Sequence, residues 1–161
     1  MPKTALFVPP LLVMIVDQIT KILALKYFAA GPVVVLPFFS LVLVHNTGVS
    51  FGLFNHMGAT GPVMLTVVSL AIAAGFGVWM TKVDNTPLAI AIGAVIGGAL
   101  GNVFDRVQSG AVIDFLDFHL GDLHWPAFNV ADSCIVMGIA FIVLDGLLFE
   151  PKRKKPGTAQ S

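Results

Sequence analysis

The chain has 161 residues, of which 57% are hydrophobic and only 11% are charged, and its mean hydropathy is +0.91. A chain with so few charged residues lacks the polar surface needed to cover a soluble globular protein of this size, so the composition indicates a membrane protein. The formal net charge is zero, which gives no electrostatic argument for a nucleic-acid partner. Cys134 is the only cysteine, and the chain therefore has no intrachain disulfide.

Four segments are apolar and long enough to cross a bilayer core of ~30 Å as helices. They cover residues 6–28, 62–80, 87–104 and 130–149. The first could be mistaken for a secretory signal peptide, because Lys3 precedes its apolar run. However, the run is too long and carries Asp17 and Lys21 in its second half. We expect a retained helix and a single integral membrane domain over residues 1–161.

The connection over residues 29–61 is rich in Val, Leu and Phe between positions 33 and 54. Such β-branched and aromatic residues, followed by an Asn-Thr-Gly turn at 46–48, favour short strands or a hairpin. The predicted fold class is therefore an all-α membrane protein. Four transmembrane helices are joined by a small outward-facing β-rich connection between the first and the second.

The basic residues predict the orientation of the chain. Six of the nine fall on one side of the four spans: Lys3, Lys82, Lys152, Arg153, Lys154 and Lys155. By the positive-inside rule this side is cytoplasmic. Both termini, including a basic tail over residues 150–161, are then inside, and the connections over 29–61 and 105–129 are outside.

The third span carries glycines at positions 93, 97 and 101, a four-residue spacing that lets another helix approach closely. In the first span, Asp17 and Lys21 lie at i and i+4, where they can form an ion pair. A structural pair is one interpretation of these two residues, and direct participation in chemistry is the other. Ionisable groups inside a membrane span are costly, and each one suggests a function.

Two polar clusters converge on the outer membrane boundary. Asn102, Asp105 and Arg106 end the third span, and Asn129 and Asp132 begin the fourth at i and i+3. Because these spans run in opposite directions, both clusters reach the same side of the membrane. Five of the nine acidic residues fall between positions 105 and 132, so a site is a better explanation than a solvated loop.

Nucleophilic and metal-dependent chemistry both fit the sequence poorly. Ser133 and Cys134 adjoin Asp132, but no histidine occurs within a span to act as their base. The four histidines lie in the connections without the helical spacing of a zinc site, and we expect them to be interfacial or hydrogen-bonded. They are His45, His56, His119 and His124.

Two neighbouring carboxylates fit better, because one can hold a proton while the other acts as a base. Asp105 directly precedes Arg106, which predicts a charged, positioning carboxylate. Asp114 lies in the apolar run VIDF without an adjacent cation, so burial should raise its pKa. Asp117 and Asp122 are expected to be solvated.

In five stretches of sequence the chain resembles the bacterial lipoprotein signal peptidases, the signal peptidase II family. The resemblance extends in order across almost the whole chain. One departure from the family pattern is Val49, where the family often has a smaller residue after the Asn-Thr-Gly turn. The stretches that carry it are DQITK (17–21), HNTGVSFG (45–52), GGALGNVFDR (97–106), VIDF (112–115) and WPAFNVAD (125–132).

The resemblance implies an inner-membrane aspartic endopeptidase that removes the signal peptide of a prolipoprotein, cutting before a cysteine that carries diacylglycerol. It implies Asp114 and Asp132 as the catalytic pair and no metal or organic cofactor. It also implies membrane lipid and cyclic peptide inhibitors such as globomycin as partners. The implied substrate-binding residues are Asn46, Asn102, Arg106 and Asn129, and the supporting residues are Asp17, Lys21 and Asp105.

Two other classes of function remain open on the sequence. A small proton-coupled transporter would also use buried carboxylates, although no repeat typical of transporters is visible. A structural membrane subunit would use them for assembly. Peptide cleavage in detergent separates the first alternative from a peptidase, because transport requires a sealed vesicle.

The orientation leads to a first prediction. In a Cys134→Ser background, a cysteine placed at position 119 should react with a membrane-impermeant thiol reagent from the outer face, because the connection over 105–129 is external. Labelling of that cysteine only from the cytoplasmic face would reverse the topology.

Overall fold

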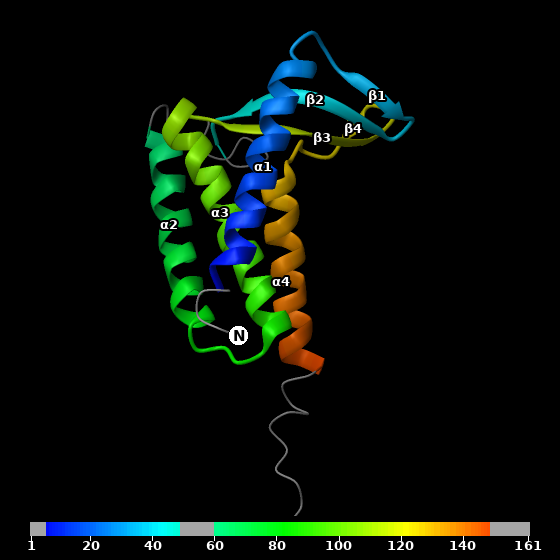
Figure 1. Cartoon of the computed structure of the whole chain (residues 1–161). Helices are drawn as coiled ribbons and strands as arrows, with labels where there is room; N and C mark the ends of the chain where they lie inside the picture. The colour runs from blue at the N-terminus through cyan, green and yellow to red at the C-terminus, as the bar shows by residue number, and fades with distance from the viewer. Residues whose placement is uncertain (1–5, 49–59, 149–161) are drawn as a thin grey trace, which may run out of the picture.

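The computed structural model describes residues 6–48 and 60–148 and contains four helices and four strands in that part of the chain (Figure 1). The helices are α1 (Val8–Tyr27), α2 (Thr60–Met80), α3 (Thr86–Ser109) and α4 (Val130–Leu148). All four are long and apolar enough to cross a membrane. The chain is therefore a multi-pass membrane protein, as the composition predicts. The basic tail, Lys3 and Val49 lie outside the described residues.

The third helix, α3, is the centre of the bundle. In its most apolar window 67% of the residues are buried, against 22%, 11% and 17% for α1, α2 and α4. The other helices present large apolar side chains on their outer faces, such as Leu12, Val67 and Leu147, which suits contact with lipid. This buried helix also carries the buried polar residues Asn102 and Asp105.

Glycines allow α1 to lie directly against α3. A Cβ added to Gly97 would lie 2.9 Å from the Cβ of Val13, and one added to Gly101 would lie 2.6 Å from Oδ2 of Asp17. Both distances are too short for a real contact. The four-residue glycine spacing thus acts as the sequence predicts, and it brings Asp17 up to the backbone of α3.

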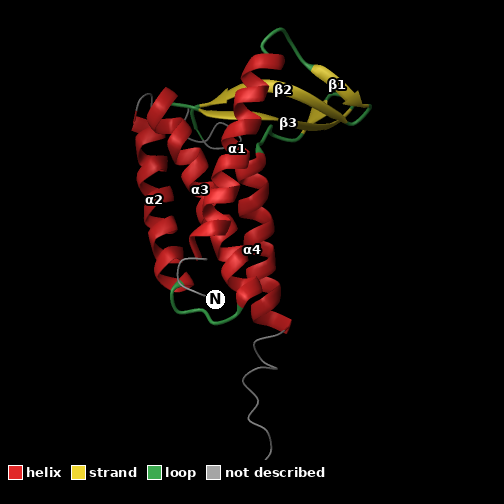
Figure 2. Cartoon of the chain, in the orientation of Figure 1, coloured by secondary structure: helices red, strands yellow, loops and turns green. Residues whose placement is uncertain are grey.

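A four-stranded antiparallel sheet lies across one end of the bundle (Figures 1 and 2). Its strands occur in the order β1 (Val33–Leu36), β2 (Phe39–Asn46), β3 (Val112–Leu120) and β4 (Leu123–His124). Asn46 Oδ1 accepts a hydrogen bond from the Gly48 amide at 3.1 Å, which forms the predicted turn after β2. The strands β1 and β2 are the β structure that the sequence predicts between the first and second helices.

Two boundaries differ from the sequence prediction. The second connection, predicted as a loop over 105–129, supplies β3 and β4, because β3 pairs along the inner edge of β2. The helix α3 continues to Ser109 and ends at Gly110 with φ +75°, a left-handed conformation that glycine adopts easily. Asp105 and Arg106 are therefore helical residues. They do not begin a loop.

The close contact of α1 with α3 leads to a second prediction. Gly97→Ala should lower the free energy of unfolding by roughly 1–3 kcal/mol, because its methyl group forces two packed backbones apart. Gly75→Ala in α2 is the matched control, since a Cβ there meets nothing within 4 Å. Thermal unfolding in detergent measures both. An equal Tm for the two variants would contradict this account of the packing.

Candidate active site

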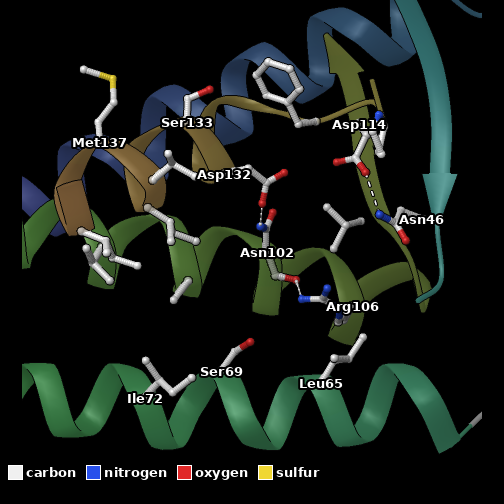
Figure 3. A pocket seen from close by; sticks show the side chains of 18 of the residues that line it. Asn46, Leu65, Ser69, Ile72, Asn102, Arg106, Asp114, Asp132, Ser133 and Met137 are labelled. Carbon is white, nitrogen blue, oxygen red and sulfur yellow. Dashed lines mark hydrogen bonds between the residues drawn. The ribbon is translucent and has the colours of Figure 1, made fainter. Parts of the chain in front are cut away.

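A groove of about 680 Å³ opens between α2 and α4, with α3 beneath it and the sheet at one end (Figure 3). Most of its lining is apolar. The polar side chains gather at the end next to the sheet, and they include five residues that the sequence analysis selected: Asn46, Asn102, Arg106, Asp114 and Asp132. The structure therefore brings these five together in one place.

A buried ion cluster lies beside this polar end, between α1 and α3. Lys21 Nζ lies 2.7 Å from Oδ2 of Asp17 and 2.7 Å from Oδ2 of Asp105. The pair of Asp17 and Lys21 at i and i+4 is as predicted. Each carboxylate also binds a backbone amide elsewhere, Asp17 that of Ala131 at 2.9 Å and Asp105 that of Ile113 at 3.3 Å. One cation thus ties α1 to α3, and its two acids reach α4 and β3.

The prediction that Arg106 is the charge partner of Asp105 is wrong. Its carboxylate binds Lys21 and the amide of Gln18, whose Nε2 lies 2.8 Å from Oδ1 of Asp105. Arg106 points into the groove instead, because consecutive residues of a helix do not face each other. Among the described residues, its Nε is the one buried side-chain nitrogen or oxygen without a hydrogen-bond partner.

Two asparagine side chains connect the ion cluster to the groove. Lys21 donates to Oδ1 of Asn102 at 2.9 Å, so the amide nitrogen of Asn102 faces the other way and donates to Oδ1 of Asp132 at 2.8 Å. Asn129 Nδ2 contacts Oδ1 of Asn102 at 3.2 Å and Oδ1 of Asp114 at 2.7 Å. Asn129 is fully buried. It therefore holds one acid from behind the groove, while Asn102 holds the other.

The start of α4 fixes the position of Asp132. Asn129 Oδ1 accepts from the Asp132 amide at 2.9 Å, and Asp132 Oδ2 accepts from the Asn129 amide at 3.2 Å. This reciprocal pair is a capping box, and it satisfies two amides that a helix start leaves unpaired. The i, i+3 spacing that the sequence shows therefore caps the helix and also places a carboxylate at its positive end.

Asp114 comes from the sheet and faces Asp132 across the groove (Figure 3). Its Oδ2 accepts from the side-chain amide of Asn46 at 2.9 Å, which connects β2 to the site. Only 2% of Asp114 is exposed. Burial raises its pKa from 3.8 to about 7; the amides of Asn46 and Asn129 oppose this shift and the charge of Asp132 adds to it. The predicted direction is confirmed. At neutral pH this carboxyl can either hold or release a proton.

The remaining acids and histidines of the second connection lie away from the groove lining. Asp122 is exposed, as predicted. Asp117 is buried, and its Oδ2 lies 2.9 Å from Nδ1 of His124, so its predicted solvated position is wrong. His119 Nε2 lies 3.0 Å from the hydroxyl of Ser40. These two histidines are hydrogen-bonded, as expected, and they join β2, β3 and β4.

Two residues with polar side chains at the site were missed. Gln18 lies within the quoted motif DQITK, next to Asp17, and that position was the only available signal. Ser69 lines the groove from α2, in an apolar run where no motif marks it.

The pKa of Asp114 leads to a third prediction. Because folding raises this pKa above 3.8, the group favours folding when protonated, and this contribution is lost as the pH rises through 7. Asp114→Asn stays neutral. The Tm of this variant minus the Tm of the wild type should therefore increase between pH 5 and pH 8. A difference that does not change with pH would show that Asp114 is not desolvated in the folded protein.

Comparison with known proteins relates this site to one family. A family model described as "Signal peptidase (SPase) II" matches residues 10–148. The lipoprotein signal peptidase of Thermodesulfovibrio yellowstonii is 46% identical over 137 residues, covering 84% of this chain and 90% of the relative. That of Vibrio cholerae is 40% identical over 151 residues, covering 91% and 87%.

A solved structure of another protein has a similar fold. It is described as a bacterial membrane enzyme determined by the in meso method at 2.3 Å resolution. It matches with a TM-score of 0.79 at 27% identity, covering 99% of this chain and 97% of the other. Sequence and fold agree over nearly the full length, and the chain belongs to the signal peptidase II family.

Proposed function

We propose that the chain is an aspartic endopeptidase that removes the signal peptide of diacylglyceryl-modified prolipoproteins, with Asp114 and Asp132 as its catalytic pair. One observation carries the catalytic assignment. Two carboxylates from different elements, β3 and α4, face one groove that continues between membrane-spanning helices. A lipidated substrate can therefore stay in the bilayer while its scissile bond reaches both acids.

The family supports the peptidase activity. Its model describes a signal peptidase, and the relatives are named lipoprotein signal peptidases. This disfavours the proton-coupled transporter, which the buried carboxylates alone leave open. It also supports prolipoproteins as the substrates. The aspartic mechanism rests on the geometry of the groove, because two acids that face the same groove are suited to activating water and protonating a carbonyl oxygen.

The two acids have different surroundings, which supports different roles. Asp132 lies in the first turn of α4, where the helix dipole favours an anion, and receives hydrogen bonds from Asn102 and the Asn129 amide. We assign it the role of base. Asp114, with its pKa raised to about 7, is the acid that holds the proton.

In the first step, Asp132 takes a proton from water, the water oxygen attacks the scissile carbonyl carbon, and Asp114 gives its proton to the carbonyl oxygen. In the second step, Asp132 gives its proton to the leaving amine while Asp114 recovers one from the tetrahedral intermediate. The carbon–nitrogen bond breaks, and both acids return to their starting states. No cofactor takes part in either step.

Substrate binding is assigned to the polar side chains around the two acids. Asn46 and Arg106 line the groove directly, and the buried, unpaired Nε of Arg106 is a donor available to a substrate oxygen. Asn102 and Asn129 hold the acids, while Asp17, Lys21 and Asp105 support them from the side of α1. A cyclic peptide such as globomycin would compete for the same groove.

The cellular location follows from the same proposal. We place the chain in the bacterial inner membrane, with both termini in the cytoplasm and the sheet on the outer side. Asp114 belongs to β3 and Asp132 to the first turn of α4, the end of α4 that lies next to the sheet (Figure 1), so the cleavage site is near the outer face. The basic residue at Lys82, in the link at the opposite end, fits the positive-inside rule.

The proposal leads to a fourth prediction. Asp114→Asn and Asp132→Asn should each lower kcat by at least ~10²–10⁴, because each removes a group that transfers protons but keeps its size. Asp122→Asn, a change at an exposed acid in the same connection, should leave kcat unchanged. Cleavage of a purified diacylglyceryl-prolipoprotein, followed by mass measurement, gives these rates. Thermal unfolding confirms that each variant is folded.

Asp105→Asn distinguishes this pair from the alternative pair of Asp105 and Asp132. Because Asp105 binds Lys21, the change should lower the Tm and reduce activity through lost positioning. An active Asp114→Asn enzyme beside a stable but inactive Asp105→Asn enzyme would move the chemistry to Asp105.

A further inference from the structure

Ser69 interrupts the apolar wall that α2 presents to the groove. Leu65, Ser69, Ile72 and Phe76 all line the groove, and their spacing places them on one face of the helix. The other three are apolar. In Figure 3 the Ser69 side chain points from α2 toward the groove, between Leu65 and Ile72. The wall that α2 contributes therefore presents one hydroxyl to a space where a lipidated substrate would lie.

The Ser69 hydroxyl has no hydrogen-bond partner among residues 6–48 and 60–148. This distinguishes it from the hydroxyls of Thr66 and Ser133. Thr66, on the same helix, donates to the Pro62 carbonyl at 2.8 Å, and Ser133 donates to the Asn129 carbonyl at 2.9 Å. Those groups are satisfied within their own helices. Ser69 is half-buried and lines the groove, and its hydroxyl is not used by a described residue, so it is available to donate to a ligand there.

We propose that the Ser69 hydroxyl donates a hydrogen bond to an ester carbonyl oxygen of the substrate's diacylglyceryl group. This inference rests on the proposed function, and it assigns α2 the recognition of the lipid. Ester carbonyls carry no donor of their own and join the polar part of a lipid to its acyl chains. The Ser69 position matches that boundary, since apolar side chains flank it on α2 and the polar end of the groove lies beside it.

A peptide carbonyl is a poorer partner for Ser69. The membrane-spanning part of a signal peptide is helical, and its carbonyls are paired within that helix. The extended part around the scissile bond has to meet Asp114 and Asp132, and the donors there are on Asn46 and Arg106. Neither segment leaves an unpaired carbonyl next to the apolar wall of α2, whereas the two esters do.

The bond forms away from the reacting atoms, so it contributes equally to the bound substrate and to the transition state. Its loss should therefore raise KM and leave kcat unchanged. For a single neutral hydrogen bond the rise in KM is about three- to tenfold. Ser69→Ala removes the hydroxyl alone. Thr66→Val is the matched control, because it removes from the same helix a hydroxyl that is already paired.

The test compares two synthetic prolipopeptides with the same sequence. One carries the diacyl group through ester bonds, and the other carries two alkyl chains through ether bonds, which lack the carbonyl oxygens. The wild type should show a lower KM for the diester than for the diether. Ser69→Ala should raise KM for the diester only, and thus remove this difference. Thr66→Val should retain it.

Two results would overturn the inference while leaving the proposed function intact. Ser69→Ala could show the wild-type KM for both substrates, or it could show an equal rise for both, which would point to a peptide carbonyl. Failure of the folded wild type to cleave the diester would overturn the proposed function and this inference together. Equal Tm values for wild type and Ser69→Ala establish that the variant is folded.

Discussion

The ammonium group of Lys21 is the interaction on which the site depends. It lies between two carboxylates at 2.7 Å each and is almost inaccessible to solvent. Charges buried in this way have to be compensated, and removing one partner of such a group costs about 3–5 kcal/mol. The two carboxylates extend the constraint, because Asp17 binds an amide at the start of α4 and Asp105 binds one in β3. Helix α4, which carries Asp132, and strand β3, which carries Asp114, are thus both connected through these carboxylates to the Lys21 ammonium group.

The same cation determines which way an amide points. Because Lys21 donates to the oxygen of Asn102, the nitrogen of that side chain is left for Asp132. Asn129 occupies the corresponding position for Asp114 and also caps α4. Lys21 carries donors only, so the amide oxygen of Asn102 has to face it. The ion cluster therefore acts on the groove indirectly, by orienting the Asn102 side chain that binds Asp132.

Much of this arrangement could be predicted from local sequence spacing. The pair of Asp17 and Lys21 follows from i, i+4, and the approach of α1 follows from glycines four residues apart. The direction of the Asp114 pKa follows from its apolar neighbours. These predictions succeed because each depends on a single element.

The failures involve contacts between elements. Asp105 was paired with Arg106 because they are adjacent in sequence, but adjacent helical residues point apart. The partner of Asp117, His124, lies in a two-residue strand. Such a strand is too short to leave a pattern in the sequence, so the burial of Asp117 could not be predicted. Ser69 has no motif, and its position becomes meaningful only when α2 is seen beside the groove. The roles of the nine selected site residues remain predictions, although the structure brings their side chains into one connected region.

A single turnover in H₂¹⁸O tests the central claim, that the two aspartates activate water directly. Excess purified protein is mixed with a diacylglyceryl-prolipoprotein, and the masses of the signal peptide and of the protein are measured after cleavage. The account predicts one ¹⁸O atom in the new carboxyl terminus of the signal peptide and none in the protein. A signal peptide without ¹⁸O, together with ¹⁸O in a carboxylate of the protein, would show that an aspartate attacks the peptide bond itself and would contradict the account.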